Sequence, residues 1–243
     1  MRWSAADAGG CAILWEPPWH LRPAELGNGT RNGYGDTADD GYRLSPGIDP
    51  FGLIAGRLVR GIDVRDYGSG RIGGTNVLRV LGGRWALTIG LLDAGKAAVA
   101  ALIGQWWGAD PALAAASAAF AAALGHIFPI FAGFRGGRGV ASMLGGLLIV
   151  CFPALVAAAA VAIAAIRITR YVSLGSIMAA ATAPLAALVL VASGWASYVA
   201  LFYAAAIGTL VIVSHRDNIQ RLRAGTERKL GEQATTSSAR GTR

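Results

Sequence analysis

Glycine, arginine and hydroxyl-bearing residues are concentrated in segment 67–79, which reads Tyr-Gly-Ser-Gly-Arg-Ile-Gly-Gly-Thr-Asn-Val-Leu-Arg. Four of the seven residues from Gly68 to Gly74 are glycines, and glycine permits tight turns and lets a backbone approach a ligand closely. The N–H groups of such a loop can cradle a phosphate, beside which Arg71 and Arg79 would place fixed positive charge. The segment indicates anion binding, while a flexible loop without a ligand is the alternative that the glycines alone leave open.

A second basic run, Arg-Gly-Gly-Arg-Gly at residues 135–139, directly precedes an apolar segment. The free N–H groups and positive dipole end of a helix starting there would attract an anion, and arginine can bind phosphate in a bidentate manner. The alternative is a basic turn that only sets membrane topology. Upstream lies His126, alone in an apolar helix, and we expect it to be a hydrogen-bonded core residue.

Two further polar segments adjoin apolar stretches. Ser173 and Ser176, in Thr-Arg-Tyr-Val-Ser-Leu-Gly-Ser at 169–176, could bind phosphate, although capping a helix is the simpler interpretation. His215 and Asn218 are three residues apart and therefore share one helical face. For this last pair, a polar helix with ordinary surface charges is the alternative.

The elements that must position these motifs are apolar. The chain is 54% hydrophobic and only 15% charged, whereas a soluble domain is about a quarter charged. Residues 139–166, 171–192 and 195–213 contain no charge, and about 20 apolar residues suffice for a helix to cross a bilayer. A soluble alanine-rich bundle would need polar stripes that these segments lack. The sequence therefore predicts an all-α, polytopic transmembrane helical bundle.

The charges of the connecting segments predict the topology. Segments 61–84, 135–138 and 167–170 and the tail from His215 are basic, whereas the short connections 108–110 and 193–194 carry no positive charge. By the positive-inside rule the basic segments face the cytoplasm.

The parity of the spans then constrains residues 139–166. Spans 85–107, 111–134, 171–192 and 195–214 each cross once, so 139–166 must start and end on the cytoplasmic face. We predict a hairpin of two short or tilted helices broken near Cys151 to Pro153. A single long kinked span is the alternative.

Several function classes are disfavoured. The net charge is +8, but the basic residues lie in short loops between spans, so nucleic-acid binding is not expected and a membrane lipid surface is. Cys11 and Cys151 form neither a disulfide framework nor a CxxC site, and the three histidines form no clustered metal motif. Within the spans, Asp93 and Lys96 are one turn apart and are expected to pair.

The two ends of the chain differ from the apolar region. Residues 1–47 are rich in Gly, Pro and Asp and contain no long apolar run, which predicts a poorly ordered polar segment. Residues 48–60 form a short amphipathic stretch that opens the membrane-integral domain at 48–229. Residues 230–243 are expected to be a disordered tail.

In combination, the motifs resemble those of the bacterial acyl-phosphate:glycerol-3-phosphate acyltransferases from about Ile48 to Lys229. The matching patterns are GSGxIGxTNVLR, GHxFPxFxxFxGGxGVA, RYVSLGS and HRxNIxRLxxGTExK. The resemblance implies transfer of a fatty acyl group from acyl phosphate to the 1-hydroxyl of glycerol 3-phosphate, giving lysophosphatidic acid and phosphate. It implies a multi-pass protein of the bacterial cytoplasmic membrane that needs no metal or organic cofactor. The chain lacks the HxxxxD motif of the other large glycerophosphate acyltransferase class.

The resemblance also assigns site residues by motif position. It implies catalytic roles for Ser69, Arg79, His215, Asn218 and Glu227, with His215 positioning and polarising the substrate rather than abstracting a proton. The implied phosphate-binding residues are Gly68, Gly70, Arg135, Gly136, Gly137, Arg138, Gly139, Ser173 and Ser176.

The chain departs from the family pattern in three places. Arg71 stands where the family has Asn, and Arg138 stands where it has Lys, which keeps the charge but changes its geometry. The family also has a complete transmembrane helix before the segment resembling Ile48–Gly52, and residues 1–47 are not expected to supply one. The missing helix leaves an inactive paralogue open as an alternative, and a small anion transporter is a second one, because transporters bind anions with Gly-rich loops and short broken helices. A transporter would need a polar path through the spans, where only Asp93, Lys96 and His126 qualify.

Overall fold

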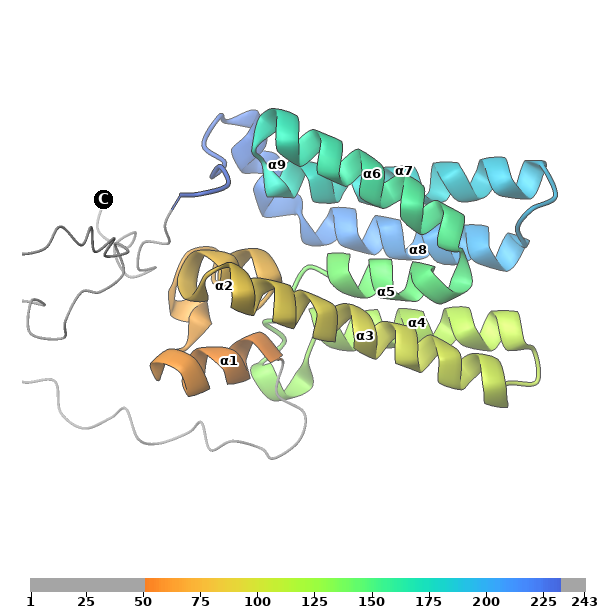
Figure 1. Cartoon of the computed structure of the whole chain (residues 1–243), viewed down its shortest axis with the longest axis horizontal. Helices are drawn as coiled ribbons and strands as arrows, with labels where there is room; N and C mark the ends of the chain where they lie inside the picture. Colours follow the sequence, from red (N-terminus) through yellow and green to blue (C-terminus); the bar gives the residue numbers. More distant parts are fainter. Residues whose placement is uncertain (1–50, 233–243) are drawn as a thin grey trace, which may run out of the picture. The chain divides into compact units, whose positions relative to one another are not determined.

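The computed structural model describes residues 51–232, and all regular structure within them is helical. Two short 3-10 helices, Val64–Asp66 and Ile130–Ala132, lie in connections. In chain order the α-helices are α1 (Phe51–Arg60), α2 (Gly74–Leu81), α3 (Gly83–Trp107), α4 (Pro111–Ile127), α5 (Val140–Val150), α6 (Phe152–Thr169), α7 (Val172–Ala192), α8 (Tyr198–Ser214) and α9 (Arg216–Arg223) (Figure 1). The polar segment 1–47, the helix expected to be missing there and the tail beyond residue 232 lie outside the described residues.

Residues 61–84, predicted as a basic loop, contain all of α2 and the start of α3. Val77, Val80 and Leu81 of α2 are buried, while Arg79 lies on the opposite side of the helix. The loop prediction was wrong because no glycine interrupts residues 75–81, between Gly74 and Gly82. The residues after them turn one apolar face toward α1 and α3.

Helices α3 and α4 form an antiparallel pair. The side chain of Asp110 caps α4 by accepting hydrogen bonds from the backbone N–H groups of Ala112 and Leu113, each at 3.1 Å. Helix α4 ends at Ile127 rather than at residue 134, where the predicted span ended. The earlier end follows from Pro129, because the residue before a proline is pushed out of the α conformation. Accordingly, Phe128 has φ −122° and ψ 60°.

Helices α5 and α6 confirm the predicted hairpin. Cys151 separates them, and Pro153 stands in the first turn of α6, where its missing N–H costs no helical hydrogen bond. Figure 1 shows α5 and α6 running in opposite directions, so both ends of the pair lie at the same end of the bundle. Helix α6 extends to Thr169, which shortens the predicted basic loop at 167–170 to the turn at Arg170 and Tyr171.

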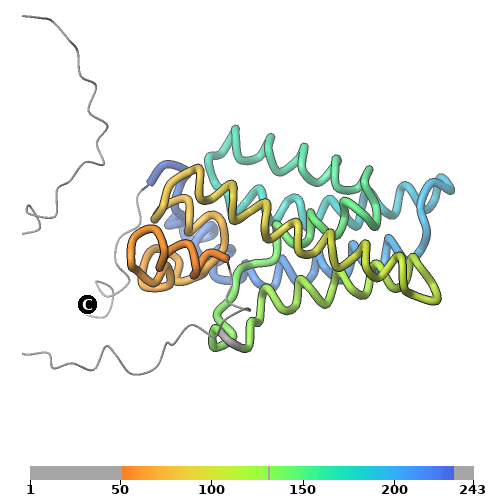
Figure 2. The backbone as a smooth tube through the Cα atoms, turned by 60° about the horizontal axis from the view of Figure 1, so that its bottom comes forward, coloured from red at the N-terminus to blue at the C-terminus, as the bar shows by residue number. Residues whose placement is uncertain are grey.

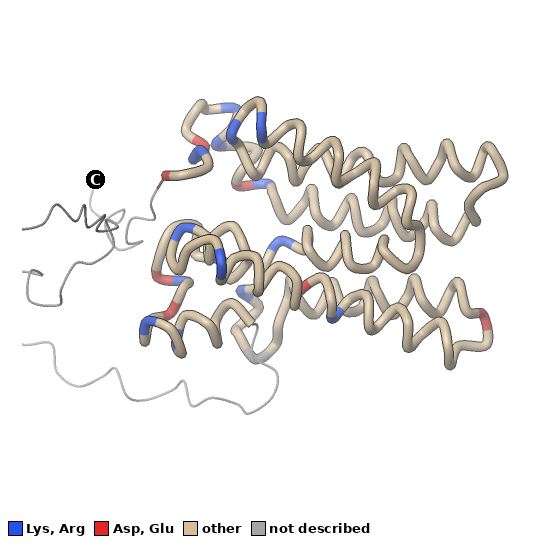
Figure 3. Tube along the Cα trace, in the orientation of Figure 1, with Lys and Arg blue, Asp and Glu red and all other residues tan. Residues whose placement is uncertain are grey.

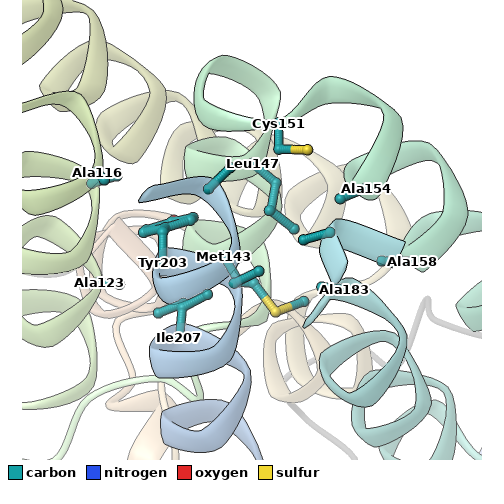
Figure 4. Close-up of a cluster of buried hydrophobic side chains, with 14 of the residues drawn as sticks. Ala116, Ala123, Met143, Leu147, Cys151, Ala154, Ala158, Ala183, Tyr203 and Ile207 are labelled. Carbon is teal, nitrogen blue, oxygen red and sulfur yellow. The ribbon is translucent and has the colours of Figure 1, made fainter. Parts of the chain in front are cut away.

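The short helix α5 lies in the middle of the packed core (Figure 4). Its Met143 and Leu147 are fully buried and belong to one cluster with Ala183 of α7 and Ile207 of α8. A Cβ atom at Gly145 would lie 2.0 Å from the carbonyl oxygen of Ala94. Glycine is therefore required for the close approach of α5 to α3, as is common between helices packed in lipid.

The chain is a multi-pass integral membrane protein. Helices α3, α6 and α7 are each long and apolar enough to cross a bilayer. Helices α8 and α9, which are bent by 58° relative to each other, are long and apolar enough when taken together. Lys and Arg gather at one end of the bundle (Figure 3), the end at which α1, α2 and α9 lie (Figure 2). At the opposite end, exposed Trp106, Trp107, Trp195 and Tyr198 are placed as an interfacial aromatic belt would be.

Candidate functional site

A cavity of about 660 Å³ opens at the basic end of the bundle and extends between the helices. Its lining has a polar part and an apolar part. The polar part contains Gly68–Arg71, Gly73–Asn76, Arg79, Asp93, His126, Arg138, Gly139, Ser173, Ser176, His215, Asn218, Arg221, Glu227 and Arg228.

The loop before α2 is folded around the side chain of Asn76, which is only 2% exposed. Its Oδ1 accepts a hydrogen bond from the Ser69 N–H at 3.0 Å, and its Nδ2 donates to the carbonyl oxygens of Val64, Tyr67 and Arg71 at 2.8–3.1 Å. Gly68 has a φ of +61° within this loop, a conformation that favours glycine. Asn76 therefore shapes the loop at the cavity wall rather than offering its amide to a ligand.

Five arginines line the cavity, and their mutual proximity marks it as an anion site. Burial lowers the pKa of Arg138 to about 10, and the positive charges of Arg221 and Arg71 act in the same direction. Burial also lowers the pKa of Arg79. Cations held together in a partly desolvated space gain stability when an anion neutralises them. The lining arginines are Arg71, Arg79, Arg138, Arg221 and Arg228.

Residues 135–139, here called the arginine turn, divide into two sets. Arg138 and Gly139 line the cavity, whereas Arg135 is exposed and does not. Gly136 and Gly137 are buried against α4 instead: a Cβ at Gly136 would lie 2.1 Å from the His126 carbonyl oxygen, and one at Gly137 would lie 2.0 Å from His126 Nε2. Thus the structure gives these two glycines a packing role rather than a place at the cavity wall.

Glu227 ties the C-terminal segment to α7 and α9. Its Oε1 accepts hydrogen bonds from Ser173 Oγ at 2.9 Å and Asn218 Nδ2 at 2.7 Å, and its Oε2 accepts one from Arg221 Nε at 2.7 Å. Burial would raise the pKa of Glu227, but these three donors outweigh burial and hold the pKa below its usual value. Glu227 therefore acts as an ionised acceptor that holds its neighbours at the cavity.

Glu227→Gln should destabilise this part of the bundle, because an amide NH₂ would replace one acceptor and oppose a donor. Leaving a buried donor unpaired costs about 1–3 kcal/mol. We expect the melting temperature of the detergent-solubilised protein to fall by roughly 5 °C. Glu232→Gln, at an exposed position nearby, should change it by less than about 2 °C. Equal shifts for the two variants would contradict the clamping role of Glu227.

His215 connects α8 to α9 and is only 2% exposed. Its Nδ1 lies 2.8 Å from the carbonyl oxygen of Val211. A carbonyl oxygen can only accept, so Nδ1 carries the ring hydrogen and Nε2 is left as an acceptor at the cavity. Burial lowers the pKa of His215 to about 4, with contributions in the same direction from Arg138 and Arg71. The imidazole is therefore neutral at physiological pH.

Two acceptor atoms thus stand out at a wall otherwise rich in donors. Besides His215 Nε2, Asn218 Oδ1 is buried and has no hydrogen-bond partner among the described residues. By contrast, the Ser176 hydroxyl donates to the Val172 carbonyl oxygen at 2.9 Å. A substrate hydroxyl group is the kind of donor that the two acceptors lack.

The apolar part of the lining is a groove between α3 and α6. Leu87, Gly90, Leu91 and Ala94 of α3 line it at helical spacing, facing residues 159–166 of α6. The Leu87 and Leu91 side chains are 65% and 64% exposed. Because α3 is long and apolar enough to cross a bilayer, these exposed leucines put one side of the groove on a helix surface suited to contact lipid. Further apolar lining comes from Ala86, Val140, Ala141, Leu144, Ala159, Ala162, Ile163, Ile166, Val172 and Ala179.

The structure brings together most of the residues that the sequence singled out. Those at the cavity wall are Gly68, Ser69, Gly70, Arg79, Arg138, Gly139, Ser173, Ser176, His215, Asn218 and Glu227; those outside it are Arg135, Gly136 and Gly137. Arg221 and Arg228 line the cavity but were not predicted. Both lie in a basic segment after the last span, where topology explained the charge equally well, although Arg221 is also a matched position of the HRxNIxRLxxGTExK pattern.

Comparisons with known proteins match the same region. The profile of the family described as glycerol-3-phosphate acyltransferase matches residues 46–225. A glycerol-3-phosphate acyltransferase of Sinorhizobium fredii is 45% identical over 192 residues, which cover 79% of this chain and 90% of the relative. One from Parasynechococcus marenigrum is 43% identical over 194 residues, 80% of this chain and 88% of the relative.

Solved structures agree with these matches. The crystal structure of PlsY, an integral membrane glycerol 3-phosphate acyltransferase, in its glycerol 3-phosphate form aligns with a TM-score of 0.65 and 36% identity, covering 75% of this chain and 88% of that one. Its lysophosphatidic acid form aligns over the same shares with a TM-score of 0.66. Since the profile covers most of the chain and the relatives exceed 40% identity, the chain belongs to the glycerol-3-phosphate acyltransferase family of integral membrane enzymes.

Proposed function

We propose that this enzyme transfers a fatty acyl group from acyl phosphate to the 1-hydroxyl of glycerol 3-phosphate, giving lysophosphatidic acid and inorganic phosphate. The observation that carries this proposal is the two-part lining of one cavity: a basic polar end continues into an apolar groove open to the bilayer. An acyl phosphate has the matching form, with a dianionic head and a lipid tail.

The polar end suits two phosphate-bearing substrates at once. Its arginines can form charge-assisted hydrogen bonds to phosphate oxygens. Asn218 Oδ1 and His215 Nε2 offer acceptors to the glycerol hydroxyl groups. A site for a simple inorganic anion would have no use for these acceptors, which favours glycerol 3-phosphate as the acyl acceptor.

The reaction needs positioning more than acid–base help, because acyl phosphate is already activated. The 1-hydroxyl oxygen attacks the carbonyl carbon, the bond between that carbon and the bridging phosphate oxygen breaks, and the hydroxyl proton passes to a phosphate oxygen. Arg79 and Arg138 stabilise the negative charge that grows on the leaving phosphate. Ser69 orients the bound phosphate, and His215 accepts a hydrogen bond that aligns the attacking hydroxyl.

We further propose that the cavity opens to the cytoplasm, as does the C-terminus. The basic residues gather at the end that holds the cavity (Figure 3), and juxtamembrane Lys and Arg favour the cytoplasmic side. Both phosphorylated substrates would then reach the site from the bacterial cytoplasm, while the acyl tail stays in the membrane.

The anion-transporter alternative receives no support from the described spans. Asp93, Lys96 and His126 contact one another in one cluster between α3 and α4 instead of forming a path along the bundle.

Purified enzyme tests the proposal directly. We expect it to release phosphate from palmitoyl phosphate only when glycerol 3-phosphate is present, with lysophosphatidic acid formed in equal amount. Palmitoyl-coenzyme A should not replace the acyl phosphate. Activity with the thioester alone would contradict the proposed donor, and no acyl transfer from either compound would favour the inactive-paralogue alternative.

A further inference from the structure

Three ionisable side chains meet inside the bundle where α3 packs against α4. Lys96 Nζ lies 2.7 Å from Asp93 Oδ1 and 2.8 Å from His126 Nδ1, and those two atoms are 3.3 Å apart. Asp93 is 3% exposed and His126 is 6% exposed. The expected pairing of Asp93 with Lys96 is confirmed, as is the hydrogen-bonded state of His126. Neither the ion pair nor the hydrogen bond explains why three ionisable side chains lie inside the bundle.

Stability alone is a poor explanation for the cluster. Ionisable groups within membrane spans are costly to bury. Replacing a buried ion pair by apolar side chains of similar volume is often neutral or stabilising. A bundle that needed only packing here could use Leu and Met, so the cluster is better explained by what it holds in place.

The geometry fixes the orientation of the His126 ring. His126 Nδ1 lies 2.8 Å from Lys96 Nζ and 3.3 Å from Asp93 Oδ1, so both partners hold this edge of the ring. Nε2 and the two carbons beside it face Gly137, because a Cβ there would lie 2.0 to 3.0 Å from these three atoms. The Phe51 ring of α1, 5.6 Å from Lys96 Nζ, holds the ammonium from a further direction.

The arginine turn is built on His126. The Gly137 N–H donates to the His126 carbonyl oxygen at 3.1 Å, and Gly136 packs against the same carbonyl. On the far side of the turn, Ser142 Oγ of α5 donates to the Asp93 carbonyl oxygen at 3.3 Å. The turn and the start of α5 therefore contact the backbone of two cluster residues, His126 and Asp93, and Arg138 lies between these two contacts.

We propose that Asp93, Lys96 and His126 form a positioning group that fixes the arginine turn and thereby directs Arg138 into the cavity. Asp93 and Lys96 set the His126 ring, the ring and backbone of His126 support Gly136 and Gly137, and the turn then presents Arg138 to a substrate phosphate. All three are positioning residues, because they act through the turn.

Backbone hydrogen exchange of the ligand-free enzyme tests the first step. Asp93→Asn, Lys96→Met and His126→Gln should each speed the exchange of peptides covering residues 135–139 by at least tenfold. Asp110→Ala is the matched control, because it removes the cap of the same helix α4 at the opposite end. Unchanged exchange in the three variants, or equal acceleration by Asp110→Ala, would overturn the proposal.

Steady-state kinetics test the second step, and this readout rests on the proposed function. Arg138→Ala first identifies the substrate whose KM depends on the turn. The three cluster variants should raise the KM of that same substrate by about tenfold and lower kcat by less than threefold, while Lys96→Arg, which keeps the charge, stays within threefold. Since both residues act through the same turn, the double variant Asp93→Asn with His126→Gln should show a KM increase no larger than that of the more impaired single variant. A KM effect without faster exchange would show direct substrate contact and overturn the positioning role.

The two readouts separate the failure of this inference from that of the proposed donor. If acyl phosphate supports no turnover, the proposed function fails, whereas the exchange rates of residues 135–139 still decide whether the cluster holds the turn. If the variants at the buried residues Asp93 and His126 do not fold, Lys96→Met still tests the proposal, because the Lys96 side chain is 29% exposed and its replacement is easier to accommodate.

Discussion

Arg79→Ala is expected to reduce the kcat/KM for acyl transfer to glycerol 3-phosphate by roughly a thousandfold. Arg79 lies on α2 with its guanidinium at the cavity, and burial lowers its pKa. A cation in such a site is poorly solvated, so its interaction with a phosphate is stronger than it would be in water. Removing one preorganised donor of this kind costs about a hundred- to a thousandfold in rate. The check is an initial-rate assay of phosphate release with both substrates varied.

Two companion variants make this result specific. Arg84→Ala removes an exposed arginine five positions along the chain, and it should leave the rate within twofold. Arg79→Lys should recover only part of the activity, because lysine keeps the charge but loses the bidentate geometry. Near-normal rates for Arg79→Ala in protein of unchanged melting temperature would remove Arg79 from the site.

Much of the helical architecture was predictable because charge constrains a membrane chain strongly. The hairpin of α5 and α6 follows from Arg138 before it, Arg167 in its last turn, Arg170 after it and Pro153 within it. Helix α2 was not predicted, since the glycines at 68–74 suggested an irregular segment. Its short amphipathic pattern becomes meaningful only when α1 and α3 are there to cover it.

The site was less predictable wherever one motif serves two roles. In the arginine turn, Arg138 reaches the cavity while Gly137 packs on the His126 ring. Spacing along the chain cannot separate these roles, because the distinction depends on a contact with another helix. Asn76 is a similar case: it lies in the glycine-rich motif 67–79, yet its side chain makes four hydrogen bonds within its own loop.

Arg221 and Arg228 are residues of the cavity wall that were not predicted. Basic residues after a last span are explained by topology alone, and only Arg221, which is a matched position of the HRxNIxRLxxGTExK pattern, carried a further signal. The hydrogen bond from Arg221 to Glu227 turns the segment after α9 back toward the cavity. This pairing spans only six residues, but Glu227 also accepts a hydrogen bond from Ser173 of α7, and that contact between distant parts of the chain brings the neighbouring Arg228 to the wall.

His215→Ala is expected to lower kcat by roughly a hundredfold, the usual contribution of a group that handles the reacting hydroxyl. Because Nδ1 is occupied by the Val211 carbonyl oxygen, the active atom is Nε2. His215→Gln can place an amide oxygen near the Nε2 position and should retain more activity than His215→Asn, whose shorter side chain reaches only the Nδ1 position. The order Gln, Asn, Ala in single-turnover rates is the measurement.

The pH dependence distinguishes a positioning role of His215 from that of an ordinary titrating base. With its pKa lowered to about 4, His215 stays neutral from pH 8 down to pH 5.5, so the ratio of wild-type rate to His215→Gln rate should be constant over this range. Glutamine does not titrate, and the ionisation of the substrate phosphates cancels in the ratio. A histidine with the ordinary pKa of about 6.5 would be charged at pH 5.5, and the ratio would fall by about tenfold. Such a fall would contradict the role of His215 as a neutral acceptor that aligns the attacking hydroxyl.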